Sequence, residues 1–300
     1  MVALISGGTG GAKLARGLRD VCEELVVIAN TGDDFEVYGV HVSPDPDLIT
    51  YWLADEIDER GYGLRGDSWR VMSALEAAGR PAWFRLGDRD LAMCLIRTEL
   101  LRAGRRLTEA HAAVVEALGV RARVLPMSDE RVATRVVVAG RPLPFQEYMI
   151  VEGAPTPIEA VELDGVDRAR PTDDVLAALA EADAVVIGPS NPVISIGPVL
   201  ALPGVREALA GARAPVVAVS PFVGGRSVKG PTEAFSAHAG IDRSATGIAR
   251  FYADVIDGVV ADEEVAAGVA ALVTDTMMET PAASRRLATD ALEFAASLRR

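Results

Sequence analysis

The sequence predicts an α/β fold with a doubly wound, mostly parallel Rossmann-like sheet, on three observations. Short apolar runs at residues 2–6 and 25–30 have the continuous hydrophobic character of buried parallel strands. A helical pattern from about Gly11 to Cys22 joins them. Similar runs at 182–192 and 214–222 each end in a small, polar loop. Strand–helix alternation at both ends of the chain places the ligand at the carboxyl ends of the strands.

The remaining segments predict more of the sheet and two insertions. The runs 256–262 and 269–276 are further strand candidates, and residues 284–299 show the pattern of a closing amphipathic helix. Residues 46–118 are mostly helical in pattern, whereas 121–165 hold the short β patterns "RARVLPM", "RVVVAG" and "FQEYMIVEG". We therefore expect a single α/β domain over residues 1–300, with a helical insertion at about 46–118 and a small β-containing insertion at about 121–165.

Composition and charge exclude several classes of protein. The formal net charge of −13 argues against a nucleic-acid surface. No apolar run reaches the roughly 18 residues that a spanning helix needs, and the N-terminal residues lack the features of a signal peptide. Cys22 and Cys94 have apolar helical surroundings, which favours buried thiols in a reducing compartment. We therefore expect a cytoplasmic protein with no nucleic-acid or membrane partner.

The glycine-rich turn "GGTGG" at 7–11 is the first candidate ligand site. Its glycines let backbone N–H groups approach a ligand closely, and a helix that begins just after them directs its positive end at an anion. We expect Gly8 and Gly10 to leave room for phosphate oxygens and to adopt backbone angles closed to other residues. The alternative is a tight strand-to-helix turn that binds nothing.

Neither common phosphate loop fits this turn. When the dinucleotide fingerprint G-x-G-x-x-G is aligned on Gly8 and Gly10, Lys13 takes the place of the third glycine. The second strand ends in Asn30, where an NAD site needs an acidic residue. No Gly-Lys-Ser/Thr follows, as a Walker loop requires. A nicotinamide-dependent oxidoreductase is therefore disfavoured, and the identity of the anion stays open.

Four aspartates follow the second predicted strand, in "NTGDDFEVYGVHVSPDPDLITYWL". They are Asp33, Asp34, Asp45 and Asp47. Carboxylates gathered at the carboxyl end of a strand repel one another unless a cation or strong donors compensate. Aspartates beside a phosphate site commonly hold Mg²⁺, which shares its coordination with phosphate oxygens and water. The alternative is that Asp45 or Asp47 caps a helix and Asp33 occupies a turn.

Two further groups of side chains carry weaker signals. In "RLGDRDLAMCLIR", Arg85, Arg89 and Arg97 are spaced to share a helix face if the helix already includes Arg85, whereas a cap at Asp88 would leave only Arg89 and Arg97 on it. These arginines suit phosphate oxygens, or they form ordinary surface ion pairs. Aromatic residues crowd the predicted helical insertion, where they form core or the apolar wall of a flat ligand. They are Trp52, Tyr62, Trp69, Trp83 and Phe84.

An ordered series of motifs resembles one known family. The motifs "SGGTGG-K", "NTGDD…SPDPD", "GDRD", "LPMSD", "FQE" and "GPSNPVISIGP" occur here as in the 2-phospho-L-lactate transferase family (CofD/FbiA) of deazaflavin coenzyme F-420 biosynthesis, from about residue 3 to residue 260. The resemblance implies a magnesium-dependent transfer. The terminal ribityl hydroxyl of the deazaflavin FO attacks the phosphorus next to the lactyl or enolpyruvyl group of a guanosine diphospho-conjugate, and GMP leaves.

The resemblance also implies roles for individual residues. Asp45 and Asp47 would hold Mg²⁺ or orient the attacking hydroxyl, and Arg89 would act with them by contacting the deazaflavin or the transferring phosphate. The residues expected to bind the substrates are Gly7, Gly8, Thr9, Gly10, Gly11, Lys13, Asp33, Asp34, Asp88, Ser190 and Asn191. A homodimer is expected on the same ground.

Two questions stay open at this level. A non-enzymatic relative that binds nucleotide-sugars and acts in regulation would share the glycine turn and the fold. The motifs "SPDPD", "GDRD" and "FQE" together favour the enzyme over this regulator. Lactyl and enolpyruvyl donors differ only by a pair of hydrogens, and no motif distinguishes them.

Overall fold

The computed structural model describes residues 1–228 and 230–299, and its centre is a parallel sheet. The strand order is β14-β13-β10-β9-β1-β2-β5, and every neighbouring pair is parallel. The strands are β1 (Val2–Ser6), β2 (Leu25–Ala29), β5 (Arg123–Pro126), β9 (Ala184–Ile187), β10 (Val216–Val219), β13 (Gly258–Ala261) and β14 (Ala270–Val273). The order reverses at β1, because β2 pairs with one side of β1 and β9 with the other. The carboxyl ends of β1 and β9 therefore flank the crevice where doubly wound folds bind ligands.

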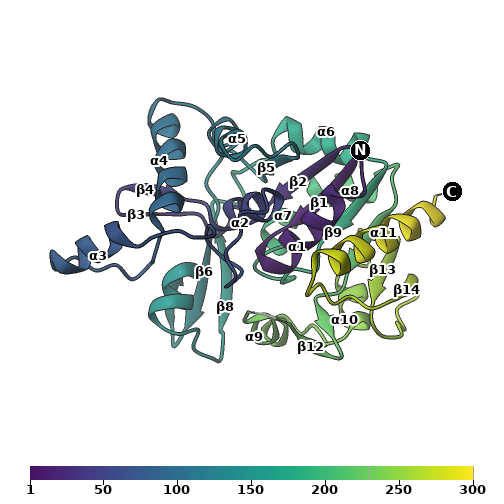
Figure 1. The fold of residues 1–300 in the computed structure, drawn as a ribbon. Coiled ribbons are helices and arrows are strands. Elements are labelled where there is room, and N and C mark those ends of the chain that lie inside the picture. Colours follow the sequence, from purple (N-terminus) through teal and green to yellow (C-terminus); the bar gives the residue numbers. More distant parts are fainter. Residues whose placement is uncertain (229, 300) are drawn as a thin grey trace.

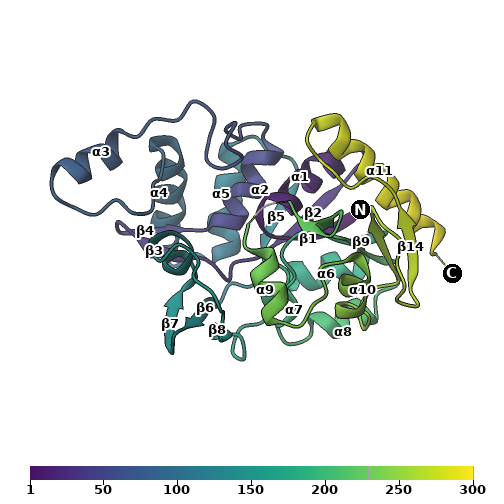
Figure 2. The ribbon, with the colours of Figure 1, turned by 90° about the horizontal axis from the view of Figure 1, so that it is seen from below.

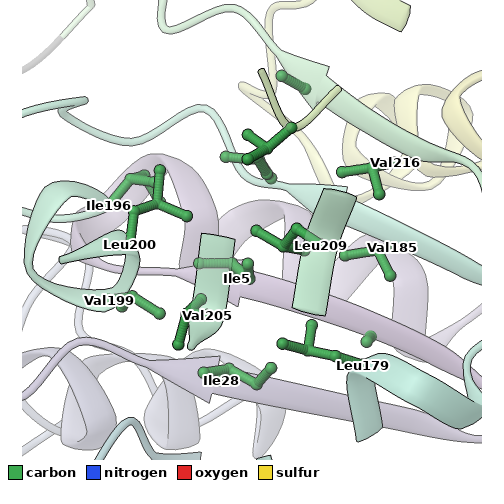
Figure 3. Packing of buried hydrophobic residues seen from close by; sticks show 14 of the residues in the cluster. Ile5, Ile28, Leu179, Val185, Ile196, Val199, Leu200, Val205, Leu209 and Val216 are labelled. Carbon is green, nitrogen blue, oxygen red and sulfur yellow. The ribbon is translucent and has the colours of Figure 1, made fainter. Parts of the chain in front are cut away.

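Helices cover both faces of this sheet, because successive strand residues point to opposite faces. One face packs against α6 (Asp173–Glu181), α7 (Gly197–Leu200), α8 (Val205–Ala210) and α10 (Ala245–Phe251). The other packs against α1 (Gly8–Arg19), α2 (Pro44–Leu53) and α11 (Pro281–Ser297). Figure 3 shows the first face, where Ile5, Ile28 and Val185 of the sheet meet Leu179, Val205 and Leu209 of the helices.

The other elements lie outside the central sheet. The helices are α3 (Arg70–Ala77), α4 (Asp88–Arg102), α5 (Leu107–Ala117) and α9 (Thr232–His238), with a π-helix η1 (Glu147–Val151). Two antiparallel pairs are formed by β3 (Phe35–Val37) with β4 (Val40–Val42), and by β11 (Phe222–Val223) with β12 (Arg226–Ser227). A small antiparallel sheet has the order β7 (Arg141–Pro144), β6 (Ala133–Val138), β8 (Ala160–Asp164). Figures 1 and 2 show α3, α4, β3 and β4 extending from the sheet on the side away from both chain termini.

The predicted strands of the two sheet halves and the closing helix are confirmed, with three corrections elsewhere. The first helix begins at Gly8 instead of Gly11, so the glycines form its first turn. The segment "RARVLPM" contributes β5 to the edge of the central sheet. The segment "FQEYMIVEG" contains the π-helix η1 instead of a strand, and this turn buries Tyr148 against Phe235 of α9 while Ile150 stays exposed. In the described part of the chain, no helix combines the length and apolar character needed to cross a membrane.

Candidate active site

A cavity of about 450 Å³, here called the first cavity, lies at the carboxyl ends of β1, β9 and β10. Nine residues predicted from the sequence line it, namely Gly7, Gly8, Thr9, Gly10, Lys13, Asp33, Asp45, Ser190 and Asn191. The segment 276–279, which follows β14, also lines it. Gly11 is buried in α1 and is not among the lining residues. The parallel sheet therefore brings together segments that lie far apart in the sequence.

Each glycine of the first turn of α1 is required for a different reason. Gly8 has φ of +62°, in the left-handed region that favours glycine, as expected. Gly10 is outside that region, so the expectation of unusual backbone angles there is wrong. A Cβ at Gly10 would instead lie 2.0 Å from the carbonyl oxygen of Pro189, and one at Gly11 would lie 2.1 Å from Ser6 Oγ. Close approach of α1 to the loop after β9 thus explains Gly10, and its close approach to the end of β1 explains Gly11.

The N-terminus of α1 faces the carboxylate of Asp45. No side chain of α1 caps its own first turn, and that turn contains no acidic residue. The Gly8 N–H donates a hydrogen bond of 2.6 Å to Asp45 Oδ1, although Asp45 comes from the first turn of α2. Ser43 holds the N-cap position of α2 without a side-chain capping bond, so neither Asp45 nor Asp47 is the cap.

Asp33 and Asp45 form a carboxylate pair around one amide. Asn30 Nδ2 donates to Asp45 Oδ2 at 2.9 Å and to Asp33 Oδ1 at 3.4 Å. Gln146 Nε2 donates to the other oxygen of Asp33 at 3.1 Å. Both carboxylates line the first cavity. Asn30 and Gln146 were not predicted as site residues, since Gln146 is 113 residues from Asp33 and no local pattern links the two.

Burial raises the pKa values of both carboxylates, and neighbouring negative charges raise that of Asp33 further. Burial raises the pKa of Asp45 to about 6, against hydrogen bonds from Asn30 and Gly8 that lower it. The pKa of Asp33 is raised well above its usual value by burial first, and then by the charges of Asp45 and Asp34. Buried like charges of this kind favour a cation or further donors beside them.

The other two predicted carboxylates face different surroundings. Asp34 accepts the Ser43 hydroxyl at 2.7 Å and lines a second cavity of about 380 Å³, together with Asp33 and Arg131. Both oxygens of Asp47 accept N–H groups of Arg97, each at 2.7 Å. Burial raises the pKa of Asp47 to about 7, and Arg97 opposes that shift. Neither Asp34 nor Asp47 lines the first cavity.

A cleft of about 180 Å³, here called the aromatic cleft, adjoins the first cavity at Asp45, which lines both. Three of the predicted aromatic residues line this cleft, namely Tyr62, Trp69 and Phe84. The guanidinium of Arg60 lies 5.1 Å from the ring centroids of both Tyr62 and Trp69. Of the other predicted aromatic residues, Trp83 lines the second cavity. The ring centroid of Trp52 lies 5.8 Å from Lys13 Nζ.

Asp88 and Arg89 lie at the start of α4, where both contact neighbouring segments of the protein. Asp88 accepts hydrogen bonds from Ser68 Oγ and from the amides of the first two residues of α3. Arg89 donates to the Arg65 carbonyl and to Glu56, and its side chain is 48% exposed. Neither residue lines the first cavity or the aromatic cleft. Their predicted substrate contacts stay predictions.

Three residues that line the first cavity have buried polar side-chain atoms without a hydrogen-bond partner in the described chain. These atoms are Ser190 Oγ, Asn191 Nδ2 and Thr276 Oγ1. Buried polar groups are usually hydrogen-bonded, so these three atoms suit a polar ligand. Thr276 was not predicted as a site residue, because only the fold brings the segment after β14 to the glycine turn.

Comparison with known proteins bears on the fold and on the family of the chain. A crystal structure of a UPF0052 family protein from Bacillus halodurans has a similar fold, with a TM-score of 0.63 and 18% sequence identity; the match covers 97% of this chain and 98% of that chain. The chain is 41% identical to a phosphoenolpyruvate transferase of Kitasatospora aureofaciens, over 99% of this chain and 98% of the relative. It is 38% identical to a 2-phospho-L-lactate transferase of Methanopyrus kandleri, again over 99% and 98%.

The family comparison covers nearly all of the chain. The sequence model described as "2-phospho-L-lactate transferase CofD" matches residues 2–291, which include every residue predicted for the site. The relatives named as transferases share the full length of the chain and not only its glycine turn. The chain is therefore a transferase and belongs to the 2-phospho-L-lactate transferase CofD family.

Proposed function

We propose that this transferase moves a phospholactyl or phosphoenolpyruvyl group from a guanosine diphospho-conjugate to the ribityl hydroxyl of the deazaflavin FO, in coenzyme F-420 biosynthesis, and releases GMP. The observation that carries the proposal is the position of Asp45 between two cavities. The first cavity has the polar features of a phosphate site, and the aromatic cleft has aromatic walls. A transfer between a nucleotide conjugate and a flat tricyclic acceptor needs both, with a polar group where they meet.

The first cavity is the proposed donor site. Its wall includes the N-terminal turn of α1, where the helix dipole and the N–H groups that follow Gly8 attract an anion. The buried Ser190 Oγ and Asn191 Nδ2 supply further donors from the loop after β9. The volume of about 450 Å³ is within the usual range for small-molecule sites.

The aromatic cleft is the proposed site for the ring system of FO. Tyr62, Trp69 and Phe84 offer faces and edges that pack against a flat apolar ligand. Its own volume, about 180 Å³, suits part of the ring system, and the ribityl chain would continue towards Asp45. The second cavity, which shares Asp33 with the first, is the competing location.

The carboxylates beside the glycine turn fit a magnesium ion. Asp33 and Asp45 converge on Asn30 and line the donor cavity, and the charge of Asp45 raises the pKa of Asp33, which a cation beside them would offset. We propose that Asp45, with Asp33, holds Mg²⁺. The metal would neutralise charge on the transferring phosphate. The predicted ligand role of Asp47 stays a prediction, because Arg97 binds both of its oxygens.

The chain contributes alignment and electrostatic stabilisation to the reaction. The hydroxyl oxygen of FO forms a bond to phosphorus, the bond from phosphorus to the GMP oxygen breaks, and the hydroxyl proton is released. A displacement of this kind depends on positioning and charge neutralisation, and it needs no covalent intermediate on the protein. Asp45 orients the hydroxyl from its place between the two cavities, and the α1 N–H groups hold the departing phosphate.

The experiment that tests this function uses the purified chain with FO and Mg²⁺. The lactyl and enolpyruvyl conjugates are supplied in separate reactions, and GMP and the phosphorylated deazaflavin are measured by chromatography. Stoichiometric formation of both products with either conjugate supports the proposal, and the faster donor identifies the three-carbon group. Binding of the nucleotide without any GMP release would contradict it and favour the regulatory alternative. Sedimentation of the same sample tests the homodimer that the family resemblance implies.

A further inference from the structure

A buried ion pair adjoins the proposed site, because its aspartate, Asp47, is one of the residues that line the aromatic cleft. Arg97, on α4, has no exposed side-chain surface, and its partner Asp47 is 50 residues away on α2. Nη1 and Nη2 of Arg97 each lie 2.7 Å from a different oxygen of Asp47. A two-bond contact between a planar guanidinium and a carboxylate fixes orientation as well as distance.

This ion pair is connected to Asp45 through a single helical turn. Asp45 and Asp47 both belong to the first turn of α2. The Asp47 N–H donates to the Ser43 carbonyl at 3.0 Å, which closes that turn. Asp45 in turn accepts the N–H of Gly8, the first residue of α1. A continuous series of contacts thus runs from α4, outside the central sheet, to the glycine turn.

A neutral histidine supports the pair from α5. His111 Nδ1 lies 3.4 Å from Arg97 Nη1, and its Nε2 lies 3.2 Å from Thr50 Oγ1 on α2. Burial, and then the charge of Arg97, hold the pKa of His111 well below its usual value. The imidazole is therefore uncharged at neutral pH and does not compete with Arg97 for Asp47.

The group formed by Asp47, Asp90 and Cys94 does not suit a metal ion of its own. Asp47, Asp90 and Cys94 present ligand atoms within 4.8 Å of one another. However, Arg97 already donates to both oxygens of Asp47, and burial raises the pKa of the Cys94 thiol far from neutrality. The cation of this cluster is the Arg97 guanidinium.

Stability alone is a poor explanation for the pair. Removing two charges from water costs about as much as their attraction returns, so apolar residues of similar volume often serve a protein core equally well. We propose that Arg97 and Asp47 are positioning residues, which fix the first turn of α2 and so hold the Asp45 carboxylate against the Gly8 amide. The expected effect on catalysis rests on the proposed function, whereas the expected effect on the position of Asp45 does not.

The test replaces the pair with apolar residues in the double variant Asp47→Leu/Arg97→Met. We expect a melting temperature close to that of the wild type, because neither charge is left without its partner. Hydrogen exchange of the Gly8 amide, measured by NMR, should accelerate about tenfold or more, since its acceptor is no longer held. The kcat for transfer should fall by roughly tenfold or more, with a smaller change in the KM for the conjugate.

A second variant covers the case in which the double variant does not fold. Arg97→Lys keeps the charge and loses the two-bond contact, so Gly8 exchange should again accelerate. Arg102→Lys is the matched control, because Arg102 is an exposed residue of the same helix whose guanidinium donates to the Gly39 carbonyl, away from Asp47. Wild-type exchange at Gly8 in folded Asp47→Leu/Arg97→Met, or in Arg97→Lys, would overturn the proposal. Absence of transfer in the wild type would overturn the proposed function instead, and the exchange rates would still decide the role of the pair.

Discussion

Asp45 is the residue on which the proposed chemistry depends most, because it contacts the first amide of α1 and lines both cavities. Asp45→Asn keeps the shape but presents an NH₂ group to one of two donors. We expect GMP release to fall about a hundredfold or more, because charge neutralisation at the phosphate is lost. The free energy of unfolding should change by less than about 2 kcal/mol, since one hydrogen bond is lost and one buried charge is removed.

The control for Asp45→Asn is Asp254→Asn, an exposed aspartate paired with Arg206. It should leave both the rate and the stability near the wild type. A folded Asp45→Asn protein with near-normal activity in Mg²⁺ would remove Asp45 from the proposed mechanism.

Substitution of two glycines of α1 should lower the stability of the protein by different amounts. Gly10→Ala should lower the free energy of unfolding by about 3 kcal/mol or more, because a Cβ 2.0 Å from the Pro189 carbonyl oxygen forces the backbone apart. Gly8→Ala meets no atom closer than 3.7 Å, so it costs only the left-handed strain of roughly 1–2 kcal/mol. Urea denaturation of both variants measures the difference. Equal losses of stability would show that the close approach at Gly10 is relieved at low cost.

At the scale of the elements, Arg89 attaches the loop between α2 and α3 to α4. Its guanidinium reaches the Arg65 carbonyl and Glu56, both in that loop. Because the side chain is 48% exposed, the ion pair with Glu56 contributes less than about 1 kcal/mol. We expect Arg89→Lys to leave the transfer rate, with FO varied at saturating conjugate, within about twofold of the wild type. A loss of tenfold or more would instead support the ligand contact that the family resemblance implies.

The elements that the sequence predicted best are those whose pattern of apolar residues is the same along their whole length. The central strands are buried on both faces, so their continuous apolar runs were recognisable without any tertiary information. The start of α1 was misplaced by three residues because its stabilising partner, Asp45, comes from another helix. The π-helix at 147–151 was mistaken for a strand, since a short segment with Tyr148 inward and Ile150 outward has no period to follow.

At the scale of the whole molecule, the topology decides which predicted residues meet. The reversal of strand order at β1 joins the glycine turn to Ser190 and Asn191, and this crevice was predictable from the strand pattern alone. The different partners of the predicted aspartates were not predictable from the sequence. Asp33 joins Asp45 through Asn30, whereas Asp47 turns to Arg97 on a helix 50 residues away. Such a pairing depends on how α4 packs on α2, which no local pattern encodes.

The same burial of carboxylates predicts how the stability of the molecule depends on pH. The pKa of Asp45 rises from near 4 in the unfolded chain to about 6 in the fold. A raised carboxyl pKa means that the folded state binds the proton more tightly. Its contribution to stability is therefore complete below about pH 4 and is lost as the pH rises through 6. For Asp45 the loss amounts to at most roughly 3 kcal/mol, at 1.36 kcal/mol per pKa unit.

We therefore expect the free energy of unfolding of the wild type, measured by urea denaturation without Mg²⁺, to decline between pH 4 and pH 7 relative to that of Asp45→Asn, which lacks this titration. The comparison between the two proteins cancels the groups remote from Asp45, including aspartates such as Asp55 whose pKa is lowered by Arg16 and Arg19. The titration of Asp33 contributes to the difference as well, because the charge of Asp45 raises its pKa. Millimolar Mg²⁺ should flatten the decline in the wild type only, because the ion binds the deprotonated carboxylate of the folded state. Parallel curves for the two proteins would show that Asp45 titrates in the fold as it does in water.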